Sequence, residues 1–146
     1  MSRIKVELGE NMLNVVHIPV RIGDINYGNH VGNDSFVSII QEARLQWLQK
    51  YHFTELDAGG VGLIMSDLAL EFNNEGYYGD SIEIKLFSGD ISRVSFVLTY
   101  ELSTTRNNEV IRLARAKTGM VCYDYSAKKI VAIPGQLHEH LQRSNL

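Results

Sequence analysis

A polar bend in the first quarter of the sequence gathers side chains suited to acid–base and oxyanion chemistry. Five of them fall within ten residues: Asp24, Asn26, Asn29, His30 and Asn33. Carboxylate and imidazole groups can take a proton from water, and amide side chains can orient it. Two glycines, Gly28 and Gly32, leave backbone N–H groups of the bend uncovered by side chains. Before a helix N-terminus, such a bend could stabilise a developing oxyanion.

The segment before the bend reads as a strand. Apolar residues alternate with mostly polar ones, which predicts a half-buried strand. The apolar phase consists of Val16, Ile18, Val20 and Ile22. If the chain stays extended, Asp24 and Asn26 continue this phase and point toward the interior. Buried polar groups need hydrogen-bond partners, so the pair indicates either a satisfied structural network or a site.

A long amphipathic helix is predicted after the bend, from about residue 34 to about residue 51. Its apolar residues recur at spacings of three and four: Phe36, Ile39, Ile40, Ala43, Trp47, Leu48 and Tyr51. Asn33, Asp34 or Ser35 could each cap its N-terminus. Glu42 lies beside the apolar stripe, where a carboxylate is more often at the solvated border than buried.

The remaining chain is dominated by extended segments with short polar connections. Strands are predicted over 63–72, 82–88, 94–102, 110–125 and 130–133, and Pro134 can open a C-terminal helix. Gly119, inside the longest strand, indicates a bulge or the close approach of another segment. One long helix with about five antiparallel strands predicts an α+β fold, most economically a sheet wrapped around the helix.

Composition restricts the classes of function. With 146 residues, the chain is expected to form a single domain over residues 1–146. A net charge of -3 gives no basic excess for binding nucleic acid. Because Cys122 is the only cysteine, no intramolecular disulfide can form, and a reducing, cytoplasmic compartment is expected. No signal peptide and no apolar run of about 18 residues is found, so no membrane association is expected.

The bend and the helix also carry a recognisable motif. Residues 24–36 read DINYGNHVGNDSF, and Glu42-Ala43-Arg44 follows in the helix. This pattern resembles the signature D-x-D-x-x-G/Q-H-V-N-N-x-x-Y, followed by E-x-A-R, of hotdog-fold acyl-CoA thioesterases of the 4-hydroxybenzoyl-CoA thioesterase type. The likeness covers about residues 13–134 and includes GDSIEIKL at 79–86. It implies a hotdog fold and hydrolysis of an acyl-CoA thioester to free acid and CoA.

The resemblance also assigns roles to residues. The catalytic carboxylate of such enzymes is the second aspartate of D-x-D, a position held here by Asn26. An amide takes up no proton at neutral pH, so Asn26 could only orient water or the thioester. The oxyanion hole is implied at the backbone N–H of Asn33. Asp24, His30 or Glu42 could supply the missing base, and Asp24 and His30 are favoured.

Structural roles compete with these assignments. His30 could cap the turn through the backbone, and Asp24 could form an ion pair with Arg21. Cys122 is expected to be an inert strand residue. His138 and His140 have no third ligand nearby and are expected to be solvated.

The resemblance further implies a homodimer or homotetramer with the site between subunits, and it implies no metal or bound cofactor. Arg93 and Lys117 are candidate contacts for the phosphates of CoA. Because Asn26 replaces the carboxylate, the alternative is a non-hydrolytic acyl-CoA-binding or sensing protein on the same fold. A hotdog-type dehydratase is disfavoured, since no histidine is paired with a downstream carboxylate in the sequence pattern.

Overall fold

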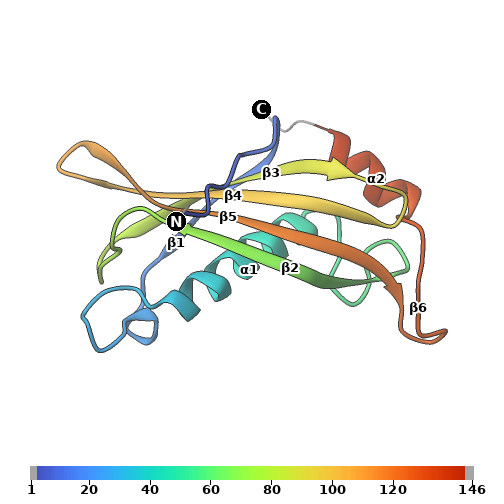
Figure 1. Ribbon diagram of the computed structural model, residues 1–146, viewed down its shortest axis with the longest axis horizontal. Coiled ribbons are helices and arrows are strands. Elements are labelled where there is room, and N and C mark those ends of the chain that lie inside the picture. Colours follow the sequence, from blue (N-terminus) through green and yellow to red (C-terminus); the bar gives the residue numbers. More distant parts are fainter. Residues whose placement is uncertain (1–2, 144–146) are drawn as a thin grey trace.

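The computed structural model describes residues 3–143 of the chain. In chain order the elements are β1 (Asn11–Pro19), the 3-10 turn η1 (Ile22–Asp24), α1 (Asn33–Gln49), β2 (Gly62–Phe72), β3 (Ser81–Ile91), β4 (Ser95–Arg106), β5 (Glu109–Asp124), β6 (Lys129–Ile130) and α2 (Gly135–Gln142). The strands form one antiparallel sheet in the order β1-β3-β4-β5-β2, with the short β6 paired to β5. Figure 1 shows α1 running along one face of this sheet. The predicted α+β arrangement is confirmed.

The core lies between α1 and the sheet. The stripe predicted for the helix is buried over Phe36, Ile39, Ile40, Ala43, Trp47 and Leu48. The inward residues of β3 and β4 meet it with a period of two: Ile82, Ile84, Leu86, Phe96, Leu98, Tyr100 and Leu102. Each large apolar side chain buried in this way contributes about 1.5–3 kcal/mol to folding. The helical spacing of apolar residues in α1 and their alternation in the strands therefore determine which side chains meet between the helix layer and the sheet layer.

β5 is paired on both sides, as its long apolar run predicts. Opposite Gly119, strand β2 bulges between Met65 and Asp67. A Cβ atom at Gly119 would overlap the Asp67 carboxylate, so the predicted close approach of another segment is confirmed. β2 itself forms an edge of the sheet, and apolar side chains of this strand, Leu68 and Phe72 among them, are exposed.

At the bend, the condition for the inward direction of Asp24 and Asn26 is not met, and the predicted cap of the helix is wrong. The chain does not stay extended after β1, because residues Ile22–Asp24 form a 3-10 turn and leave Ile22 77% exposed. The turn, not the phase of the strand, therefore sets the directions of Asp24 and Asn26. The N-cap of α1 is Gly32, with extended backbone, so Asn33 is the first helical residue and not a cap.

α2 follows Pro134 as predicted and packs across the start of β1 and the end of β3 (Figure 1). The carbonyl of Leu141 accepts hydrogen bonds from the Asn11 amide and the Ser88 hydroxyl. The expectation of solvated histidines is wrong for His140, whose ring stacks on Tyr51 with centroids 3.5 Å apart. Within residues 3–143, no helix is long and apolar enough to cross a membrane.

Candidate active site

The bend is closed by its own backbone. The N–H of Asn26 donates to the carbonyl of His30 at 2.9 Å, and that of Gly32 donates to Asp24 at 3.0 Å. Ile25 and Val31 form a β-bridge between these two bonds. The loop residues 24–32 therefore have a defined backbone, which can hold a side chain such as His30 in one place.

His30 is the side chain of the bend best prepared for proton transfer. Its Nδ1 lies 3.2 Å from the carbonyl oxygen of Val31. A carbonyl only accepts, so Nδ1 carries the proton in this hydrogen bond and Nε2 keeps a free lone pair. The side chain is 30% exposed, within reach of solvent and of a ligand.

Asn26 lies beside His30, and Gly28 separates them. The Oδ1 of Asn26 accepts a hydrogen bond from the Gly28 N–H at 2.9 Å. A Cβ atom on Gly28 would lie 3.2 Å from Nε2 of His30 and 3.3 Å from Oδ1 of Asn26. Only a hydrogen atom therefore fits comfortably between the imidazole and the amide.

The structure places the other two candidate bases in structural contacts. The Asp24 carboxylate accepts a hydrogen bond from the backbone N–H of Arg21 at 2.9 Å and lies 3.9 Å from its guanidinium, so the alternative of an ion pair with Arg21 is confirmed. Glu42 is exposed on α1 and accepts a hydrogen bond from Gln46. It lines a different cavity, among residues 42–54.

A cavity of about 200 Å³ opens beside the bend. Its lining combines an apolar floor with a polar rim: His30, Val31, Asn33, Phe36, Phe72, Asn73, Asn74 and Glu75. The rings of Phe36 and Phe72 meet edge to face, 5.5 Å apart. Asn33 opens the helix after a start without a side-chain cap, and within the described residues its N–H is not found to donate a hydrogen bond. His30 and the positive end of α1 thus face one small apolar-floored space.

Glu75 is a member of this cavity that sequence reasoning misses. Its Oε1 lies 3.8 Å from Nε2 of His30, and its Oε2 accepts a hydrogen bond from the Tyr77 hydroxyl at 2.8 Å. This contact raises the pKa of the Tyr77 phenol. The loop carrying Glu75 is fixed to the bend, since the Val31 N–H donates to the carbonyl of Gly76 at 2.8 Å. Glu75 thus places a carboxylate beside the imidazole of His30, a contact that no motif in the sequence indicates.

A buried polar network around Arg44 is a second feature that sequence reasoning misses. Arg44 is 4% exposed. Its guanidinium donates to Glu55 at 3.0 Å and to the Tyr100 hydroxyl at 3.1 Å. Tyr100 in turn pairs with Thr118 at 2.7 Å. Burial by itself lowers the pKa of Arg44, but Tyr100 and Glu55 outweigh it and raise that pKa overall. The sequence does indicate this burial, because the spacing of Arg44 from Ile40 and Trp47 places it within the apolar stripe of the helix.

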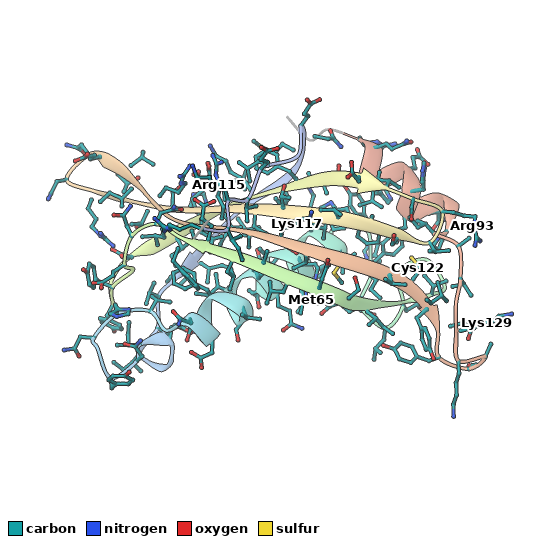
Figure 2. All side chains as sticks on the ribbon, in the orientation of Figure 1. Met65, Arg93, Arg115, Lys117, Cys122 and Lys129 are labelled. Carbon is teal, nitrogen blue, oxygen red and sulfur yellow. The ribbon has the colours of Figure 1, made fainter. Side chains whose placement is uncertain are left out.

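The two candidate phosphate contacts lie away from the cavity. Lys117 is exposed in the middle of β5, and Arg93 lies in the β3–β4 turn, at the end of the sheet opposite the bend (Figure 2). Neither lines the cavity beside His30.

Cys122 is buried in β5, and burial raises the pKa of its thiol to about 11, so it is the inert residue expected. Within residues 3–143, no group of three or more His, Cys, Asp or Glu side chains is arranged to hold a metal ion.

Comparison with protein families matches residues 20–142 to the Thioesterase-like superfamily, and the chain belongs to this family. Comparison with curated proteins finds no match.

Solved structures of thioesterases share the fold, which is the predicted hotdog fold. A 1,4-dihydroxy-2-naphthoyl-CoA thioesterase from Synechocystis is 22% identical with a TM-score of 0.77, over 87% of this chain and 93% of that one. A 4-hydroxybenzoyl-CoA thioesterase mutant with Asp replaced by Asn, complexed with 4-hydroxybenzoyl-CoA, is 18% identical with a TM-score of 0.78, over 88% and 98%. A DHNA-CoA thioesterase from Staphylococcus aureus is 18% identical with a TM-score of 0.75, over 86% of each chain.

Proposed function

We propose that this protein hydrolyses the thioester of an acyl-CoA to the free acid and CoA. The observation that carries the proposal is the pairing of His30 with the N-terminus of α1 at one cavity. The cavity has a floor of Phe36 and Phe72, suited to an acyl group, and a volume of about 200 Å³. Membership of the Thioesterase-like superfamily supports the same chemistry. The solved relatives named above act on aryl-CoA thioesters, which agrees with a small aromatic-lined pocket.

The geometry supports the following reaction. The thioester carbonyl lies in the cavity with its oxygen toward the N–H of Asn33. Nε2 of His30 takes a proton from water as the water oxygen adds to the carbonyl carbon, a step in which general-base assistance is worth about 10²–10⁴-fold. The negative oxygen of the tetrahedral intermediate is stabilised by the helix N-terminus. The C–S bond then breaks, and the imidazolium returns the proton to the CoA thiolate.

Asn26 has a supporting part in this scheme. Its amide holds the loop beside His30 through the Gly28 N–H, but Asn26 does not line the cavity and takes up no proton. The base is therefore His30, and Asp24 and Glu42 keep their structural contacts.

We also propose that the site is completed by a second copy of the chain, in a homodimer or homotetramer. β2 is an edge strand with exposed apolar side chains, and Phe72 at its end also lines the cavity. A copy paired along β2 would therefore lie next to the cavity. Arg93 and Lys117 remain candidate contacts for CoA phosphates in such an assembly.

The alternative is a protein that binds acyl-CoA without hydrolysing it. Asn26 favours this function, because the usual carboxylate is missing. The 4-hydroxybenzoyl-CoA thioesterase mutant supports it too, since a protein of this fold that has exchanged an aspartate for asparagine holds an acyl-CoA in its crystal.

Thiol release from a panel of aromatic and aliphatic acyl-CoAs decides between the two. The panel compares the wild type with Asn26→Asp, His30→Ala and Asp24→Ala. Turnover by the wild type that is lost in His30→Ala supports the hydrolase. A wild type that binds acyl-CoA in calorimetry but releases no thiol, together with an active Asn26→Asp variant, supports the binder. Loss of turnover in a folded Asp24→Ala variant would contradict the structural role given to Asp24.

A further inference from the structure

The cavity beside the bend holds a carboxylate that the motif does not contain. Glu75, in the β2–β3 loop, is the only acidic residue among those lining the cavity within the described part of the chain. The β2–β3 loop and the bend that carries His30 lie at the same end of the sheet (Figure 1). We propose that Glu75 is a positioning residue that acts through His30: its charge stabilises the imidazolium formed during hydrolysis. This inference rests on the proposed thioesterase function.

The backbone around Glu75 is fixed from two sides. On one side, Gly76 accepts the N–H of Val31 at 2.8 Å, which joins the loop to the bend. On the other, the Arg106 guanidinium donates to the carbonyl of Glu75 at 2.9 Å. Arg106 is itself held by an ion pair with Asp80. The position of Glu75 relative to His30 therefore follows from hydrogen bonds of the main chain.

The two carboxylate oxygens of Glu75 have different partners. Oε2 accepts the hydrogen bond from Tyr77, whose ring lies under the Arg106 guanidinium at 4.8 Å. Oε1 is left facing Nε2 of His30 at 3.8 Å. This separation exceeds a direct hydrogen bond but is short enough for one water to contact both atoms. A water beside the two atoms can donate one hydrogen to each and be held there for attack.

The charge of Glu75 matters at the step that creates a cation. When Nε2 takes the proton, a carboxylate at this distance stabilises the imidazolium through its opposite charge. Other charged groups nearby have partners or positions of their own. Asp24 is paired with Arg21, Arg106 with Asp80, and Asp34 lies over the backbone of Gly32 at the helix start. Because Glu75 is 57% exposed, solvent moderates the effect.

The test compares Glu75→Gln, Glu75→Ala and a matched control in steady-state hydrolysis of the best acyl-CoA of the panel. Glu75→Gln keeps the shape and an acceptor for Tyr77 but removes the charge. We expect kcat to fall about 10-fold to 100-fold with KM within about twofold, because the charge acts on the imidazolium and not on bound substrate. Added formate should restore activity to Glu75→Ala, where the carboxylate site is vacated, but not to Glu75→Gln.

The control is Glu83→Gln, which removes the carboxylate of another histidine–glutamate pair. Glu83 lies 3.2 Å from His17 between β1 and β3, outside the cavity. The kcat of the Glu83→Gln variant should stay within about twofold of the wild-type value. If the wild type hydrolyses acyl-CoA and folded Glu75→Gln matches it in kcat, or if formate rescues neither variant, the role of Glu75 is wrong while the thioesterase function stands. A wild type that releases no thiol overturns both.

Discussion

The Nδ1 atom of His30 lies 3.2 Å from the carbonyl oxygen of Val31, the next residue in the chain. Val31 is buried, and its N–H is bonded to Gly76 in the β2–β3 loop. The carbonyl is therefore held in place, and it fixes which nitrogen of the ring carries the proton. In this way the backbone of the bend prepares Nε2 as the basic atom.

Replacing His30 by Gln should remove the base and preserve the bend. An amide can hydrogen bond but accepts no proton at neutral pH, so we expect kcat for acyl-CoA hydrolysis to fall about 10²–10⁴-fold. Thiol release measures the effect, and circular dichroism checks the fold. Activity within a few-fold of the wild type would show that His30 is not the base.

Gly28 provides a finer test of the same geometry. In Gly28→Ala the new Cβ would lie 3.2 Å from Nε2 of His30, so the ring or the loop must shift by a few tenths of an ångström. We expect kcat to fall about tenfold, because small displacements of a catalytic group are costly. The control is Gly23→Ala in the preceding turn, where nothing lies within 4 Å of the added atom. Equal activity of the two variants would contradict the proposed position of the imidazole.

Much of the fold could be predicted because it rests on simple periodicities. The stripe from Phe36 to Leu48 and the alternation in β3 and β4 are set by burial, which the sequence reports directly. The conformation of the bend could not be predicted from these periodicities. The 3-10 turn at Ile22–Asp24 ended the alternation, and nothing in the apolar pattern marks such a turn.

The site was predicted only where it is local in the chain. Asn26, His30 and Asn33 belong to one motif, and the structure keeps them around one helix end. Glu75 and Phe72 enter the cavity from a loop and strand more than thirty residues away, through the pairing of Val31 with Gly76. Such a contact depends on tertiary packing, and no spacing in a single sequence indicates it.

The buried network of Arg44 should make an asymmetric contribution to stability. Glu55→Ala leaves the guanidinium buried without its counter-ion, so we expect a loss of about 3–5 kcal/mol in the free energy of unfolding. Arg44→Met should cost less, about 1–2 kcal/mol, because Glu55 has a side chain 21% exposed and can be hydrated. Urea denaturation measures both. The control is the exposed pair of Glu139 with Arg143, where Glu139→Ala should lower the free energy of unfolding by less than about 1 kcal/mol. An equally small loss for Glu55→Ala would contradict the prediction.

His140 should make the folded protein less stable in mild acid. Burial against Tyr51, and to a lesser degree the charge of Arg143, lower the pKa of His140 from its ordinary value of 6.5. The unfolded chain therefore binds a proton at this histidine more tightly than the folded protein does. The stability that comes from the stacked neutral ring is present above pH 6.5 and is lost as the pH falls through the lowered pKa. Urea midpoints from about pH 7.5 to about pH 5.5 should therefore fall less in His140→Gln than in the wild type. His138→Gln, on the same helix, leaves the stack in place as a control. The same pH dependence in both variants would refute the assignment to His140.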